Sequence, residues 1–529
     1  MEHTKVKVWL PFLFSITMVA GMFIGFKMRD EIPGKGFFYT ERPRPLQEVM
    51  ELIYNKYVDT VDMNMLADTA MQAILSKLDP HSVFIPAAEL DQVNEEIAGG
   101  FFGIGIEFNM YDDSLHVMNV LKDGPGFKAG LQTGDRILKA NGFVISGKKI
   151  NQDSIRLILR GPRGSIADVQ VLRGNKILNI QITRDMIPIS SVDAAYMVDG
   201  STGYIRLNKF TQNTYREFML SLESLKKQGL QKLIFDLRGN GGGVLDEAVE
   251  IADEFLEGDK LITYTIGRHS PRKEYRCRRE GQFEKGQLLI LADEGTASAS
   301  EIIIGALQDW DRAVIIGRRT FGKGLVQDQF DLSDKSALRL TIARYYTPIG
   351  RSIQRSYAQG GKAYYDEINN RLHIADSARA DSITGNNGKA YLTSSGKKVY
   401  GGGGISPDIY IQADTAYMDT SLALIFLKGL TGDFGYRYFT ANRQLSRDYK
   451  TTREFVNGFT IDDNSWKFFE TMAMKDSVNV SGISEKAKAY LCRILKASVA
   501  RHLWHNEGYY ECSNKEDEVM QKALELLKK

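Results

Sequence analysis

The segment from residue 287 to residue 308 constrains the fold of this chain more than any other. Its first part, Gln287 to Ala292, is a hydrophobic run typical of a buried strand, and Glu301 to Gln308 has the spacing of an amphipathic helix. Ser298 lies in the turn between them, where the helix begins. The unpaired N–H groups of a first helical turn face any negative charge that develops there. The sequence therefore predicts a strand, a tight turn that presents a serine, and a helix.

Two interpretations of this turn stay open from its residues alone. In the first, Ser298 is a nucleophile and the backbone N–H of Ala299 is a donor to an oxyanion. In the second, Thr296, Ser298 and Ser300 are helix-capping residues, because small hydroxyl side chains are preferred where helices begin.

A lysine further along the chain favours the catalytic interpretation. Lys323 lies between two glycines and beside Phe321 and Leu325, where an ammonium group is poorly solvated. To act as a general base, its pKa must fall from about 10.4 toward about 7 or 8, and burial moves the pKa in that direction. Gln327 is four residues on, and in a helix or a strand that spacing places its amide on the face of Lys323.

A second strand, loop and helix contain the glycine cluster Gly239-Asn240-Gly241-Gly242-Gly243. A loop this rich in glycine exposes backbone N–H groups, so Gly243 is the other candidate oxyanion donor. The cluster lacks a glycine at the next position, so it does not complete a dinucleotide fingerprint. In the segment around Lys323, Gly324 stands where a phosphate-binding loop needs Ser or Thr. We therefore expect no nucleotide and, because no cysteine and histidine cluster has metal-site spacing, no metal.

Together these motifs resemble those of the C-terminal processing peptidases, also called tail-specific proteases. The segments that carry the resemblance are 236–243, 296–302, 308–313, 320–327 and 402–408. The resemblance implies a serine peptidase in which Ser298 is the nucleophile, Lys323 the general base and Gln327 the group that positions the lysine. It also implies an oxyanion hole made by the N–H groups of Gly243 and Ala299, and no cofactor.

The segment between the N-terminal helices and the protease core resembles a PDZ domain. Gly103-Ile104-Gly105-Ile106 is similar to its carboxylate-binding loop. Exposed N–H groups in such a turn capture a terminal carboxylate, and the adjacent strand edge pairs with an extended peptide. Arg160 is a candidate for contacting that carboxylate or for coupling its binding to the active site, and a plain turn arginine is the alternative.

The N-terminus carries a candidate membrane anchor. Val8 to Phe26 is uncharged over 19 residues, which is long enough to cross a bilayer core of about 30 Å. Lys5 and Lys7 precede this run and favour a cytoplasmic N-terminus. The prediction is a bacterial envelope protein, anchored in the inner membrane with its catalytic part in the periplasm or outside. Secretion after signal cleavage is the alternative.

The predicted fold class is multidomain α+β. It combines an N-terminal membrane anchor and helices, a PDZ domain, an α/β serine protease core and a helical C-terminal region. The boundaries are 1–27 for the anchor or signal, 38–98 for the N-terminal helices, 99–185 for the PDZ domain, 186–412 for the Ser/Lys core with a polar surface insertion at 358–398, and 413–529 for the C-terminal region. Cys492 and Cys512 lie in that last region, and their spacing leaves a disulfide between them open.

The predicted function is that of a serine endopeptidase which recognises C-terminal tails of proteins or peptides and cleaves them through an acyl-enzyme. The net charge of +2 gives no reason to expect a nucleic-acid partner. The membrane is a partner through the N-terminal segment, and a second copy of the chain or an adaptor stays open. Two alternatives remain: a catalytically idle PDZ scaffold, and a Ser/His hydrolase of small esters. In the latter, a histidine ring would lie beside Ser298 in place of the Lys323 amine.

Overall fold

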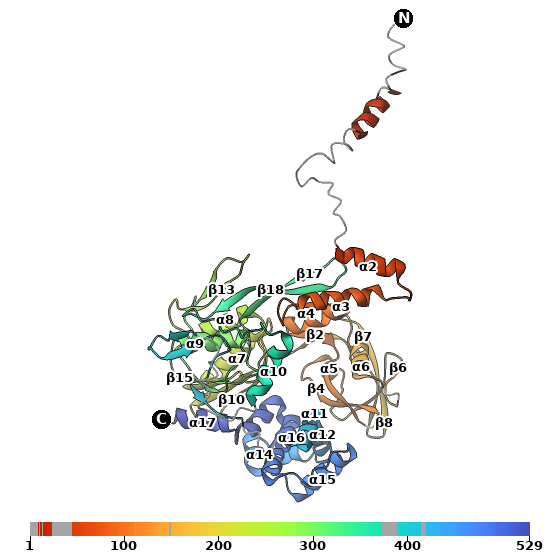
Figure 1. Ribbon diagram of the computed structural model, residues 1–529. Helices are drawn as coiled ribbons and strands as arrows, with labels where there is room; N and C mark the ends of the chain where they lie inside the picture. Colours follow the sequence, from red (N-terminus) through yellow and green to blue (C-terminus); the bar gives the residue numbers. More distant parts are fainter. Residues whose placement is uncertain are drawn as a thin grey trace. The chain divides into compact units, whose positions relative to one another are not determined.

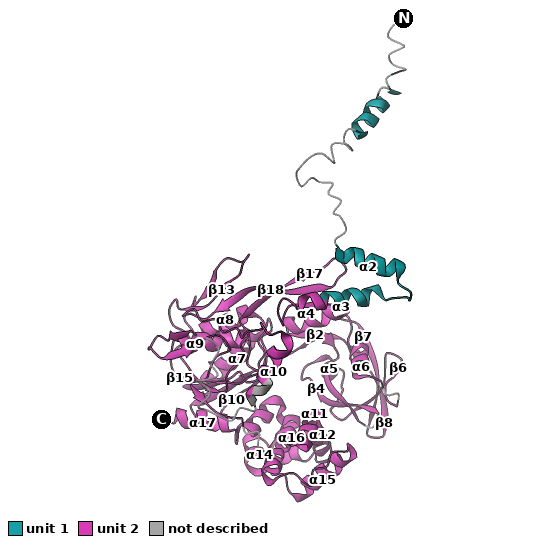
Figure 2. Ribbon diagram, in the orientation of Figure 1, with its two compact units in different colours: residues 1–71 teal, residues 72–529 magenta. Residues whose placement is uncertain are grey.

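The computed structural model describes residues 9, 11–12, 14–23, 45–111, 113–147, 150–372, 389–413 and 419–528. Two compact units divide the chain, residues 1–71 and residues 72–529 (Figure 1, Figure 2). Residues 14–23 are helical, α2 spans Pro45–Lys56, and α3 spans Met63–Leu75. Within the described part of the chain, no helix has the length and apolar character needed to cross a membrane. The predicted anchor at 1–27 lies partly outside these residues.

A six-stranded antiparallel sheet forms the module predicted to be a PDZ domain. Its order is β3-β4-β5-β7-β8, with β6 added beside β5. Burial alternates along β7, where Ala167, Val169 and Val171 face the core, as expected for a strand with one face covered. The elements are β3 (Ile106–Tyr111), β4 (Ser114–Val120), α5 (Pro125–Lys128), β5 (Arg136–Ala140), β6 (Phe143–Val144), α6 (Gln152–Leu159), β7 (Ile166–Arg173) and β8 (Lys176–Thr183). The chain enters and leaves this module through the antiparallel pair β2 (Gly100–Gly103) and β9 (Asp185–Pro188).

A six-stranded sheet in the order β10-β11-β12-β15-β16-β21 carries the glycine cluster and the Ser298 turn. Every neighbouring pair is parallel except β10 and β11. Adjacent residues of β12 and β15 belong to different cores, because successive side chains point to opposite faces of a strand. The strands are β10 (Val192–Met197), β11 (Thr202–Leu207), β12 (Lys232–Asp236), β15 (Gln287–Ala292), β16 (Val314–Gly317) and β21 (Ile409–Tyr410).

Helices cover both faces of this sheet (Figure 1). On one face lie α7 (Thr214–Lys227), α8 (Leu245–Asp253) and α9 (Ala299–Asp309). On the other lies the last helix, α17 (Glu518–Leu527), through Val519, Met520, Ala523 and Leu527. Helix α17 is therefore part of the core around this sheet, which the sequence did not indicate.

A second sheet, β1-β18-β13-β14 with β17 paired to β18, carries the Lys323 segment. Lys323 immediately precedes the hairpin of β17 (Leu325–Asp331) and β18 (Ala337–Tyr346). The other strands are β1 (Val83–Ile85), β13 (Leu261–Ile266) and β14 (Lys273–Arg276), and helix α4 (Ala87–Ala98) follows β1.

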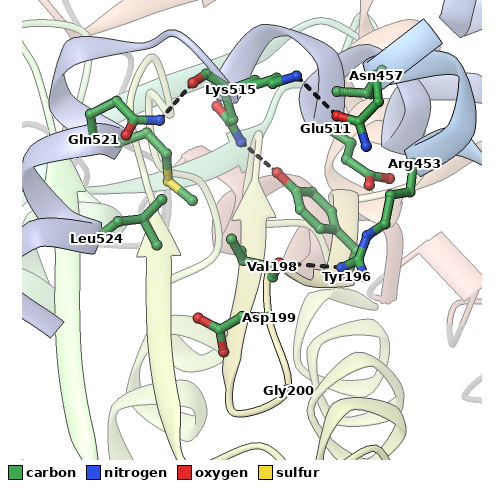
Figure 3. A pocket seen from close by; sticks show the side chains of 13 residues that line it. Tyr196, Val198, Asp199, Gly200, Arg453, Asn457, Glu511, Lys515, Gln521 and Leu524 are labelled. Atoms are coloured by element: carbon green, nitrogen blue, oxygen red, sulfur yellow. Dashed lines mark hydrogen bonds between the residues drawn. The ribbon is translucent and has the colours of Figure 1, made fainter. Parts of the chain in front are cut away.

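The C-terminal region forms a separate hydrophobic core of helices. They are α11 (Thr420–Leu427), α12 (Leu430–Ala441), α13 (Leu445–Asp448), α14 (Thr452–Gly458), α15 (Asp463–Lys475) and α16 (Glu485–Asn514). Tyr111 of the PDZ module donates a hydrogen bond to Asp433 of α12 at 2.7 Å. A cavity of about 480 Å³ lies between this region and the β10–β11 turn. Figure 3 shows that several of its polar groups bond to one another, including the Lys515 amine, which donates to the Asn457 side chain at 3.0 Å.

One feature differs from the sequence-based expectations. Part of the predicted surface insertion packs against the core, because α10 (Gly361–Leu372) carries Tyr364, which is only 2% exposed. The insertion continues in the hairpin of β19 (Ala390–Leu392) and β20 (Lys398–Tyr400), and residues 373–388 lie outside the described part. Cys492 and Cys512, whose pairing the sequence left open, are both free thiols.

Candidate active site

Ser298 occupies the N-cap position of α9 with φ 56° and ψ −115°. This backbone conformation is unfavourable for a residue with a side chain and costs on the order of 1–3 kcal/mol. The flanking residues Ala297 and Ala299 are buried, whereas Ser298 is partly exposed and lines a cavity of about 410 Å³. The turn therefore presents this one side chain to a ligand.

The two neighbouring hydroxyl groups have structural roles. Thr296 donates to the carbonyl of Leu237 at 2.9 Å, and Ser300 donates to the carbonyl of Asn240 at 3.1 Å. Both bonds fasten the turn to the loop that follows β12. Of the three hydroxyl residues considered for capping, Ser298 alone lines the cavity.

Lys323 and Gln327 line the same cavity as Ser298. The Lys323 Nζ donates to Gln327 Oε1 at 2.8 Å, and the Gln327 amide nitrogen donates to the carbonyl of His81. That carbonyl belongs to a turn in which the Asp79 carboxylate accepts from the N–H groups of His81 and Ser82, each at 2.8 Å. The Gln327 amide is thus oriented from both ends, so its oxygen faces the amine.

Burial is the main cause that lowers the pKa of Lys323 from its ordinary value of 10.5, and the charge of Arg339 lowers it further. The carboxylates of Asp79 and Glu301 act in the opposite direction. Among the described residues, the hydrogen-bond partner of its amine is the neutral amide of Gln327, and no carboxylate takes that place. Burial without an ion-pair partner therefore favours the unprotonated amine, as a general base requires.

The glycine loop packs directly against the Ser298 turn. A Cβ added to Gly242 would lie 2.7 Å from the Ser298 Cβ, so only glycine fits there. Gly243 follows with φ 143° and pairs with Phe210. The N–H of Ala299 is a first-turn donor without a partner in its helix, and both Gly243 and Ala299 line the cavity.

Glu301 joins the serine turn to the lysine segment, and the sequence analysis missed this role. Its Oε2 accepts from the backbone N–H groups of Ser298 and Lys323, both at 2.9 Å. Its Oε1 accepts from Thr320 Oγ1 at 2.5 Å and from the Gly322 N–H at 2.7 Å. Burial raises the pKa of this fully buried carboxyl, but all four partners are donors and therefore require an acceptor-only carboxylate. Ser298 followed three residues later by Glu301 is a capping-box pattern, which was the available signal.

In the described part of the chain, the structure does not place a histidine ring beside Ser298, where the Ser/His alternative requires one. No histidine is among the described residues that line the cavity. The ring of His81 instead bonds the hydroxyl of Tyr364 at 3.0 Å, and burial lowers the pKa of His81 to about 4. The geometry gives the Ser/His alternative no support.

The predicted PDZ residues lie outside this cavity. Gly103 to Ile106 connect β2 with β3, and β3 is the edge strand of its sheet. Arg160 ends α6, donates to Glu95 of α4 at 3.1 Å and stacks over Phe101 at 4.3 Å. Arg160 therefore connects the PDZ helix to α4, the helix that contributes Ile97 to the cavity.

A serine at a strained strand-to-helix turn, with a desolvated amine and backbone donors around one cavity, is a combination found in serine hydrolases. Comparison with known proteins assigns the class more closely. Residues 201–360 match peptidase family S41 and residues 103–183 match the PDZ domain. Residues 422–505 match a family of unknown function, DUF8443.

Two relatives of this chain are named as carboxy-terminal processing proteases. The chain is 35% identical over 313 residues to the carboxy-terminal-processing protease of Bartonella bacilliformis, covering 58% of this chain and 71% of that protein. It is 32% identical over 351 residues to the carboxy-terminal processing protease CtpB of Bacillus subtilis, covering 64% and 72%. The solved photosystem II D1 C-terminal processing protease aligns with 71% of this chain and 89% of its own, at 26% identity and a TM-score of 0.36. The chain belongs to the C-terminal processing serine proteases of family S41, and the idle-scaffold alternative is set aside.

Proposed function

We propose that Ser298 and Lys323 are the catalytic dyad of this protease. The Ser298 hydroxyl attacks the peptide carbonyl while the neutral Lys323 amine takes its proton, and the N–H groups of Gly243 and Ala299 stabilise the oxyanion. The lysine then gives the proton to the departing amine, and water hydrolyses the acyl-enzyme. The observation that carries the proposal is the placement of Ser298 and Lys323 on one cavity, with the amine held by Gln327 instead of a carboxylate.

The pH dependence follows from the lowered pKa of Lys323. The amine is a base only when unprotonated, so kcat/KM should rise with pH through one group whose pKa lies below the ordinary 10.5. The measurement is kcat/KM for one peptide across pH, with the folded state checked at each point. A rise centred at or above the ordinary lysine value would contradict a desolvated base.

We further propose that the PDZ module selects substrates by their free C-terminus. The support is the Gly103–Ile106 loop beside β3, whose free edge can pair with an extended peptide. Amidation of a peptide's C-terminus removes a charge-assisted hydrogen bond, so we expect cleavage of the amide to be about ten- to a hundredfold slower below saturation. The Ser298→Ala chain supplies the background. Equal rates for acid and amide would rule out recognition of the terminus.

The cellular location is also a proposal. The uncharged run from Val8 to Phe26 behind Lys5 and Lys7 supports an inner-membrane anchor with the catalytic part outside the cytoplasm. Expressed in bacteria, the full chain should stay with membranes after alkaline carbonate washing, whereas a chain that lacks residues 1–27 should not. Release of the full chain by carbonate would contradict the anchor.

A further inference from the structure

Arg339 is a second cationic residue in the wall of the catalytic cavity, and neither the proposed chemistry nor the sequence motifs use it. It lies in β18 directly opposite Gln329 of β17, two residues from Thr341, which is opposite Gln327. Directly opposed residues point to the same face of a sheet, and so do residues two apart. The fold therefore places Arg339 on the face that carries the amide of Gln327.

The guanidinium of Arg339 has few partners. Among the described residues its one side-chain hydrogen bond goes to Gln329 Oε1 at 3.1 Å, and it makes no ion pair. Arginine has five N–H donors. Two other inward-facing arginines have more partners: Arg351 pairs with Asp309 at 2.5 Å, and Arg312 donates to three backbone carbonyls.

The cavity itself has no negative charge. Of the described residues that line it, the basic ones are Lys323 and Arg339, and none is an aspartate or glutamate. A partly buried cation without a counter-charge is stabilised by a ligand that brings one, and arginine binds carboxylates with directional hydrogen bonds.

We propose that Arg339 is a specificity-determining residue that binds a substrate carboxylate close to the scissile bond. The carboxylate is either an acidic side chain of the tail or the terminal carboxylate of the chain being cut. The inference rests on the proposed roles of Ser298 and Lys323, because these fix where the scissile bond lies.

Arg339 has a second effect, on the base. Four charged or titratable groups act electrostatically on Lys323: Arg339, Asp79, Glu301 and His81. Of the charges, only Arg339 lowers the pKa of Lys323, whereas the two carboxylates raise it. Removing the guanidinium should therefore move the rising limb of the pH profile of kcat/KM to higher pH.

The test uses the full chain and matched peptide pairs. In one series Glu replaces Gln at each of the three positions on either side of the cleaved bond, and in the other the free C-terminus is compared with the amide. We expect the parent to favour the carboxylate of at least one pair by about tenfold or more in kcat/KM. Arg339→Gln should remove that preference and Arg339→Glu should favour Lys at the same position. Arg344→Gln is the matched control, because Arg344 is exposed on the same strand and does not line the cavity.

The outcomes distinguish an acidic side chain from the terminal carboxylate as the ligand of Arg339. They also distinguish failure of the Arg339 proposal from failure of the Ser298/Lys323 dyad. A preference that follows the Glu/Gln exchange and depends on Arg339 identifies an acidic side chain, whereas one that follows the acid/amide exchange and depends on Arg339 identifies the terminus. Cleavage in which Arg339→Gln weakens no carboxylate preference overturns the role of Arg339 and leaves the dyad standing. An acid/amide preference that Arg339→Gln retains belongs to the PDZ module and does not count for Arg339. Absence of Ser298-dependent cleavage of every peptide overturns both.

Discussion

Ser298→Ala and Lys323→Ala are each expected to lower kcat by about 10⁴-fold or more while the chain stays folded. A nucleophile and its base act as a unit, so the loss of either one disables the same step and the double variant should be no worse than the singles. The measurement is steady-state hydrolysis of a tail peptide, with circular dichroism and thermal unfolding to verify the fold.

Gln327→Ala supplies a graded control for this prediction. Gln327 holds the amine without taking part in proton transfer, so its loss should reduce activity less than the loss of Lys323. If Lys323→Ala keeps substantial activity in a folded chain, another group is the base.

Glu301→Gln is expected to cost about 3–5 kcal/mol of stability and about a hundredfold or more in kcat. Each oxygen of the Glu301 carboxylate accepts two hydrogen bonds, and two of the four donors are the backbone N–H groups of Ser298 and Lys323. An amide NH₂ group cannot accept a hydrogen bond. In either orientation of the glutamine side chain, its NH₂ group therefore faces two of the four donors and leaves both without an acceptor. The Ser298 turn and the Lys323 segment should then lose the carboxylate that holds them together, and the distance between nucleophile and base should increase.

The pH profile distinguishes positioning from general destabilisation. The charge of Glu301 raises the pKa of Lys323, so its removal should move the rising limb to lower pH. Glu217→Gln is the matched control, because Glu217 also accepts from backbone N–H groups, those of Ser191 and Val192, but does not line the cavity. Glu217→Gln should lower the stability of the fold without shifting the rising limb of the pH profile of kcat/KM. A Glu301→Gln chain with full kcat and an unshifted limb would show that Glu301 does not position the dyad.

The central strand, turn and helix were predictable because their signals are local. The hydrophobic run Gln287–Ala292 is β15 to the residue, and the helix begins directly after Ser298. Four-residue spacing predicted Gln327 on the face of Lys323, but residues that far apart on a regular strand lie about 13 Å from each other. The hydrogen bond between them forms because Lys323 precedes β17 and the register of β17 shifts between Val326 and Gln327. The glycine cluster could be connected to the serine only through the family resemblance, since nothing local shows that Gly242 packs against Ser298.

The remaining features depend on contacts between distant segments. Arg339 lies on the same cavity as Lys323 because β17 and β18 form a hairpin. The Gln327 amide donates to the carbonyl of His81, in the Asp79 turn, although the two residues are 246 positions apart in the sequence. The last helix, α17, carries an ordinary amphipathic pattern that does not say which surface it covers, and only the fold places it on the core sheet. Cys492 and Cys512 share a region, but sharing a region does not bring two sulfur atoms together.

The most direct test of the central claim is the identity of the acylated residue. A peptide p-nitrophenyl ester should acylate the protease faster than water removes the acyl group, which gives a burst of p-nitrophenolate equal to the enzyme concentration. After acid quench, mass spectrometry of the digested protein should place the acyl group on Ser298, and the Ser298→Ala chain should show neither burst nor adduct. Hydrolysis with the acyl group on another residue, or with the burst preserved in Ser298→Ala, would contradict the account.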